Sequence, residues 1–127
     1  MSVKYNIVQR VNPRDVTAER KFYAVAQKNG EISLRELAER ISEMSTVSTI
    51  DTMAVLESLI KVIPTELLNG RIVRLGEFGT FRLTLSSDGA DTQEGFTKAM
   101  IRKVRLNFRA GRLIANNLKT AEYFKQN

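Results

Sequence analysis

Apolar and polar residues alternate at the start of the chain, which is the pattern of a half-buried strand. Val3, Tyr5 and Ile7 are separated by polar residues over residues 3–11. A second alternating stretch covers residues 21–28 and stops at Asn29-Gly30. These two stretches predict a β-hairpin within residues 1–32. An isolated hairpin is only marginally stable in water, so we expect it to pack on the main domain.

The next part of the chain has helical spacing. Ser33 and Glu36 form a capping box ahead of apolar residues at helical intervals, and this first helix is expected to end near Met44-Ser45. Ser48 or Thr49 can cap a second helix of about 20 residues, which is longer than the mean helix of a globular protein. Pro64 lies inside that second pattern and should kink it or end it early.

Alternation returns after Gly70, where a helix can stop in a left-handed conformation. Residues 72–75 read as a short strand, and Gly76 suits a tight turn. Two longer strands follow over residues 78–86 and 102–109, each with an apolar and a mostly basic or polar face. A last helix begins near Arg112, and residues 119–127 are expected to fray.

Composition narrows the possible functions. The chain has 127 residues, of which 43% are hydrophobic, and this suits one domain with a largely aliphatic core. It contains no Cys and no His, so thiolate ligands and the commonest metal ligand and general base are missing. Neither a phosphate-binding loop nor a dinucleotide fingerprint is present. We therefore expect a non-enzyme with no metal, cofactor or small-molecule substrate. The lack of a signal-peptide core or membrane-length apolar run predicts a cytoplasmic protein without a membrane partner.

The charge is unevenly distributed. A net charge of +6 and a pI near 9.9 favour a polyanionic partner. Acidic residues dominate residues 31–66, whereas basic residues dominate residues 98–125. The basic character therefore belongs to the second half of the chain.

Two motifs resemble those of the HU/IHF family of bacterial histone-like DNA-binding proteins. They are Gly-Glu-Phe-Gly-Thr-Phe at residues 76–81 and Phe-Arg-Ala-Gly-Arg at residues 108–112. The resemblance covers about Ser33 to Leu118. It implies an α+β fold in which residues 33–127 form an HU-like DNA-binding domain and residues 1–32 an N-terminal extension. It also implies a two-fold homodimer with interlocked helices, and double-stranded DNA as the partner within the nucleoid.

The predicted DNA contacts are basic residues of the two long strands and their neighbours. Cations spaced two residues apart on one strand face can lie along phosphates, giving largely sequence-independent binding suited to compacting DNA. The candidates are Arg74, Arg82, Lys98, Arg102, Lys103, Arg105, Arg109 and Arg112.

The segment between these strands departs from the family pattern. In HU-like proteins it is a basic arm with a proline that wedges between bases. Here residues 86–97 contain no proline, Lys or Arg, and they include Asp88, Asp91 and Glu94. Phe96 is the one candidate for an intercalating wedge, and packing within the arm is the alternative.

Three further alternatives remain open at this stage. The helix pair over residues 33–53 could be a helix-turn-helix of a sequence-specific transcription regulator, although Asp51 would then face phosphates. An HU-like scaffold with an acidic arm could instead bind a protein. The extension could be a structural cap, or an additional edge for DNA or a partner that uses Lys4, Arg10, Arg14, Arg20 and Lys21.

Overall fold

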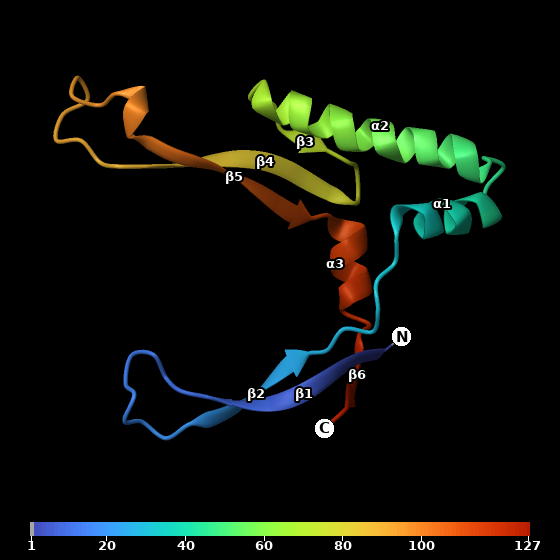
Figure 1. The fold of residues 1–127 in the computed structure, drawn as a ribbon, viewed down its shortest axis with the longest axis horizontal. Coiled ribbons are helices and arrows are strands. Elements are labelled where there is room, and N and C mark those ends of the chain that lie inside the picture. The colour runs from blue at the N-terminus through green and yellow to red at the C-terminus, as the bar shows by residue number, and fades with distance from the viewer. Residues whose placement is uncertain (1) are drawn as a thin grey trace. The chain divides into compact units, whose positions relative to one another are not determined.

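The computed structural model describes residues 2–127, which form two compact units (Figure 1). Unit 1 comprises residues 2–33 and Asn117–Asn127, and unit 2 comprises Leu34–Asn116. The fold is mixed α+β, with two three-stranded sheets and three α-helices in the described residues. None of the helices in residues 2–127 is long and apolar enough to span a lipid bilayer.

Unit 1 is a three-stranded sheet with the order β2-β1-β6. Strands β1 (Ser2–Arg10) and β2 (Lys21–Ala26) form the antiparallel hairpin that the alternation predicted. Strand β6 (Glu122–Lys125) pairs with β1 in parallel.

The prediction that residues 119–127 fray is wrong. Besides the β6 pairing, the Asn127 side chain accepts a hydrogen bond from the Ile7 amide at 3.0 Å and donates one to the Ile7 carbonyl at 3.1 Å. The second edge of β1 needs hydrogen-bond partners, and the end of the chain supplies them. Four residues of sequence give too little pattern to reveal a parallel edge strand.

Two helices open unit 2. Helix α1 spans Leu34–Glu43 and α2 spans Thr49–Leu68. The Ser48 hydroxyl caps α2 by accepting a hydrogen bond from the Asp51 amide at 3.1 Å. At the other end, Gly70 has a φ of 83°, and its amide donates to the Leu67 carbonyl at 2.9 Å. This is the left-handed helix end that Gly70 predicted.

Pro64 does not end the second helix. It has no amide hydrogen, so it leaves a carbonyl of the preceding turn without its helical partner. The Thr65 hydroxyl donates to the neighbouring Lys61 carbonyl at 3.2 Å, which adds a donor at this point. The helix continues to Leu68 over its full 20 residues.

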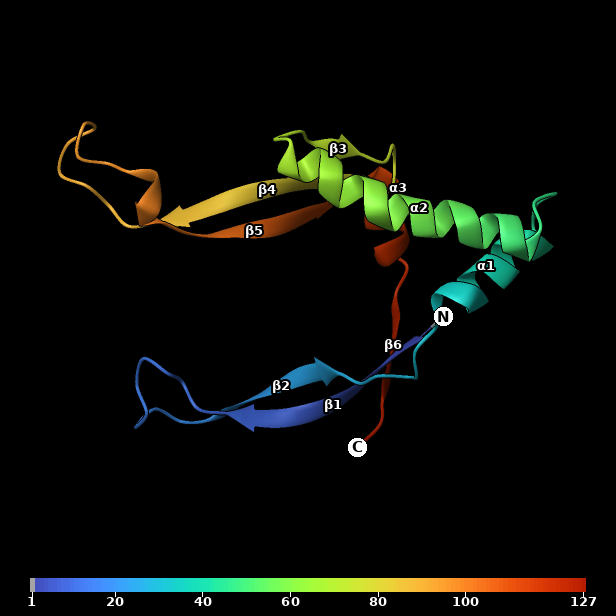
Figure 2. The same cartoon turned by 45° about the horizontal axis from the view of Figure 1, so that its top comes forward.

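The second sheet has the order β3-β4-β5 and lies beside α2 (Figures 1 and 2). Its strands are β3 (Val73–Arg74), β4 (Gly79–Ser87) and β5 (Ile101–Ala110). Strands β4 and β5 form a long antiparallel ribbon, with a short 3-10 helix, η1 (Lys98–Met100), before β5. Helix α3 (Arg112–Leu118) follows the ribbon and leads into unit 1.

One ribbon face is apolar and faces α2. Phe81 pairs with Phe108 across the strands, with ring centroids 4.8 Å apart, and Leu83 pairs with Leu106. Phe81, Leu83, Leu106 and the end of α2 surround an apolar hollow of about 360 Å³. Within the described residues, the buried apolar core consists of Ala38 and Leu67. A single chain therefore has little interior.

Candidate nucleic-acid interface

A glycine turn connects the short strand to the ribbon. Gly76 has a φ of 53°, and the Phe78 amide closes the turn by donating to the Leu75 carbonyl at 3.0 Å. The Gly111 amide donates to the Phe78 carbonyl at 2.8 Å, and the Leu113 amide donates to the Glu77 carbonyl at 3.2 Å. The two sequence motifs therefore meet, because one supplies the turn and the other the backbone donors that hold it.

Gly79 and Gly111 of the two motifs are required because neighbouring atoms occupy the space that a Cβ would fill. A Cβ on Gly79 would lie 2.6 Å from the ring atom Cζ of Phe108, and one on Gly111 would lie 2.6 Å from the carbonyl carbon of Glu77. Both separations are well below a normal carbon–carbon contact of about 3.5 Å or more. The motif thus sets the ends of β4 and β5 against each other and fixes the register of the ribbon.

The opposite ribbon face is polar and cationic. The register pairs Thr80 with Arg109, Arg82 with Asn107, and Thr84 with Arg105. Arg74 of β3 pairs with Thr80 and extends the same face. We call this surface the polar ribbon face; it comprises Arg74, Thr80, Arg82, Thr84, Ser86, Lys103, Arg105, Asn107 and Arg109. It carries five cations and no carboxylate, so it offers phosphates a continuous positive strip.

Three of the predicted arginines converge at one end of this face. Arg74, Arg82 and Arg109 line a hollow of about 250 Å³, together with Ile72, Thr80, Asn107 and Phe108. All three arginines are exposed, and none forms an ion pair within the described residues. Guanidinium groups present several donors in a planar fork that matches phosphate oxygens, so each arginine around this hollow can contact a backbone phosphate.

The other predicted basic residues lie apart from this hollow. Lys103 and Arg105 are further along the polar ribbon face, whereas Lys98 belongs to η1 and Arg112 begins α3. Arg102 lies at a register irregularity near Ser86 and forms an ion pair with Asp88. The structure therefore divides the candidates into five on one face and three elsewhere.

The arm between the strands has its own local order. The Gly95 amide donates to the Thr92 hydroxyl at 3.0 Å, and the Phe96 amide donates to the Gln93 carbonyl at 3.2 Å. The Phe96 side chain is 40% exposed. Its role as a wedge stays a prediction.

Two uncharged residues, Thr80 and Asn107, are missing from the predicted DNA contacts. Both line the arginine hollow, and the Asn107 side-chain amide also donates to the Thr84 hydroxyl at 2.9 Å. Extending the two-residue spacing of Arg82 by one position reaches Thr80, whereas Asn107 already lies within the spacing of Lys103, Arg105 and Arg109.

Helix α2 presents many apolar side chains to solvent. Ile50 is 79% exposed and Val55 63%, and the first turn contains Asp51 but no basic residue. Val55 and Val62 also line an open apolar hollow of about 410 Å³ on this helix. Such a surface suits contact with protein better than contact with phosphates.

Comparison with known proteins places the chain in a family and shows that its fold is similar to solved structures. A family described as an HU domain fused to a wHTH, Ig or glycine-rich motif (HU-HIG) matches residues 1–126. No curated protein matches the sequence. A crystal structure of a candidate bacterial DNA-binding protein from Bacteroides vulgatus ATCC 8482 superimposes with a TM-score of 0.66 at 14% identity. The match covers 98% of this chain and 47% of that one, so this chain spans about half the length of the solved structure.

Proposed function

Because the chain belongs to the HU-HIG family, we propose that it binds double-stranded DNA non-catalytically through the polar ribbon face. The observation that carries this proposal is the set of five cations on one face without a carboxylate. The convergence of three of them, Arg74, Arg82 and Arg109, around one hollow adds to it. A β-ribbon can follow a DNA backbone, and the similar protein from Bacteroides vulgatus is itself described as a candidate DNA-binding protein.

The binding is expected to be largely independent of sequence. Base discrimination needs side chains placed against base edges in a groove, commonly Arg on guanine or Asn on adenine. The amide of Asn107 is already engaged by Thr84, and the first turn of α2 carries Asp51 without a cation. Affinity would then come from counterion release, which suits DNA compaction in the bacterial nucleoid.

A titration against salt tests this proposal. If each of two protomers neutralises three or four phosphates, the logarithm of the binding constant should fall against that of the salt concentration with a slope on the order of −6 or steeper. Fluorescence anisotropy of a random duplex of about 30 base pairs, or about three turns of B-DNA, would measure it. A slope near zero, or strong preference for one sequence, would contradict the proposal.

We further propose that the chain functions as a homodimer held together by α2. The apolar residues Ile50, Val55 and Val62 are each more than half exposed in one chain, and a second copy would cover them. Two-fold homodimers are the commonest assemblies of soluble proteins. Both ribbons of a dimer could then contact one DNA duplex.

The dimer predicts a specific mass. Sedimentation equilibrium should give twice the chain mass of 14.4 kDa. Val62→Glu would place a charge in the apolar contact and should weaken the dimer by at least about tenfold, because a buried unpaired charge costs several kcal/mol. The control Glu57→Gln changes an exposed polar position of the same helix and should leave the mass unchanged. A monomeric wild type would contradict the dimer.

A further inference from the structure

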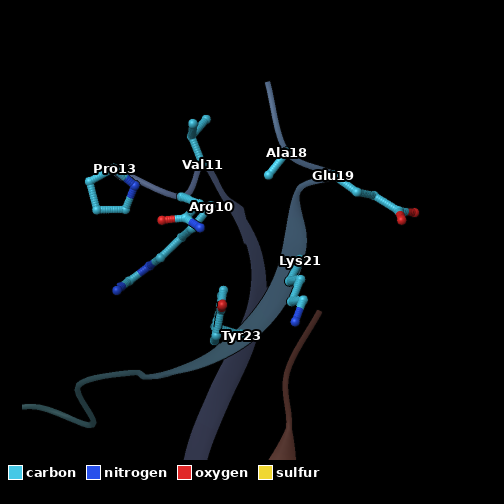
Figure 3. Close-up of a pocket in the computed structure, with 8 residues that line it drawn as sticks. Arg10, Val11, Pro13, Ala18, Glu19, Lys21 and Tyr23 are labelled. Atoms are coloured by element: carbon cyan, nitrogen blue, oxygen red, sulfur yellow. The ribbon is translucent and has the colours of Figure 1, made fainter. Parts of the chain in front are cut away.

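A second hollow lies at the loop end of the β1–β2 hairpin in unit 1, away from any sequence motif (Figure 3). Its volume is about 540 Å³, within the range of small-ligand sites. It is open to solvent and lined by Arg10, Val11, Asn12, Pro13, Ala18, Glu19, Lys21 and Tyr23. The family resemblance assigns no role to this surface.

Two cations face each other across the hairpin at this point. Arg10 and Lys21 are direct register partners, and both are exposed. Like charges directly opposite each other destabilise a strand pair. Neither residue forms an ion pair in the part of the chain that the structure describes, where the ion pairs are Arg71–Glu66 and Arg102–Asp88. The repulsion between Arg10 and Lys21 therefore destabilises the hairpin, and an anion bound between them would relieve it.

The nearby carboxylates do not neutralise these cations. Figure 3 shows the Glu19 side chain extending away from Arg10. Asp15 accepts hydrogen bonds from the Thr17 hydroxyl at 2.7 Å and the Thr17 amide at 3.1 Å, and these bonds lower the pKa of the Asp15 carboxyl. Asp15 is thus engaged in ordering the loop.

The remaining wall of the hollow is largely apolar. Tyr23 is 48% exposed and shares a strand face with Lys21, while Val11 and Pro13 come from the other strand and the loop. A simple inorganic anion would use only the cations. A nucleotide unit of DNA offers a phosphate to the cations and a sugar to the ring and the aliphatic groups.

We propose that this hairpin hollow is a second DNA contact, in which Arg10 and Lys21 bind a backbone phosphate of the duplex and Tyr23 packs against the adjoining sugar. The inference rests on the proposed function, because the ligand is the same duplex DNA. Whereas the proposed function assigns DNA binding to the polar ribbon face, this inference assigns part of it to the N-terminal extension.

The test compares two charge-matched variants of the full chain. Arg10→Ala/Lys21→Ala removes the two cations of the hollow. Lys28→Ala/Lys125→Ala also removes two exposed cations from unit 1, but Lys28 does not line the hollow and Lys125 lies on the opposite sheet face, in register with Tyr5. Both double variants carry a net charge of +4, two less than the +6 of the wild type.

Each hollow is expected to bind one phosphate, so a dimer binds two through its hairpins. Arg10→Ala/Lys21→Ala should therefore make the salt slope shallower by about 2 and lower the affinity about tenfold near 0.1 M salt. The control should stay within about threefold, since charges away from the contact act only through screened long-range attraction. Tyr23→Ser should lower affinity and leave the slope unchanged, because a sugar contact releases no counterion.

The outcomes separate this inference from the proposed function. Equal affinities and slopes for both double variants would overturn the hairpin site while leaving ribbon binding intact. The hairpin site would also be overturned if ribbon substitution lowered the affinity and Arg10→Ala/Lys21→Ala did not. A thermal midpoint of Arg10→Ala/Lys21→Ala at or above that of the wild type would show that its weaker binding is not unfolding, as expected from removing a like-charge pair. Absence of duplex binding by the wild type would overturn both proposals.

Discussion

Arg82→Ala/Arg109→Ala should weaken duplex binding on the order of 100-fold near 0.1 M salt, because it removes two phosphate contacts per protomer and four per dimer. Both residues line the arginine hollow, and both are exposed without an ion-pair partner in the described residues. The salt slope should become shallower by about 3 to 4, since each lost phosphate contact contributes about 0.9. Anisotropy titrations at three or more salt concentrations measure both effects.

The matched control is Arg35→Ala/Arg40→Ala on α1. These arginines are also exposed cations of unit 2, and their removal gives the same net charge of +4 from the original +6. If binding followed net charge alone, both variants would weaken it equally. Equal losses, or an unchanged ribbon variant, would contradict the assignment of binding to the polar ribbon face. Unfolding midpoints of both variants should match the wild type, because surface substitutions usually alter stability by less than about 0.5 kcal/mol.

Gly111→Ala should lower the free energy of unfolding by about 2 to 3 kcal/mol, as expected for a methyl group forced into a closely packed position. Its Cβ would lie 2.6 Å from the carbonyl carbon of Glu77 and 2.9 Å from that of Phe78. Backbone atoms cannot rotate away as a flexible side chain can. The substitution would therefore displace the Gly111 amide from the Phe78 carbonyl and loosen the turn from α3. Urea denaturation at fixed protein concentration, followed by circular dichroism, measures the loss.

Gly89→Ala provides the comparison. Gly89 lies in the arm, and a Cβ there would have nothing within 4 Å. Its substitution should leave stability unchanged or raise it by up to about 1 kcal/mol, because alanine restricts the unfolded chain more than glycine does. Similar losses at the two positions would mean that the motif glycine acts through general flexibility and not through close packing.

Local patterns were sufficient for most of the secondary structure. Ser48 as a helix cap, Gly70 as a helix end and the alternation of residues 81–86 each depend on neighbours a few positions away, and the structure confirms all three. The same alternation placed Arg82, Lys103 and Arg105 on one strand face. Their contact with DNA stays a prediction.

Features that depend on distant residues were not predictable in the same way. The parallel pairing of β6 with β1 joins the two ends of the chain. The ion pair of Arg102 with Asp88 occurs beside a strand irregularity that periodicity does not show. The pairing of Arg10 with Lys21 could be predicted only from the hairpin register, which is set by the loop between the strands.

The sequence by itself determined the α+β composition, the glycine motif and the separation of an apolar from a cationic ribbon face, because spacing along one chain settles each of them. Tertiary structure decided which cations converge: strand register brings Arg74, Arg82 and Arg109 around one hollow and leaves Lys98 and Arg112 on other elements. The physical reason is that alternation fixes the side of a strand on which a residue lies, whereas the partner opposite it depends on long-range hydrogen bonds and close packing at Gly79 and Gly111.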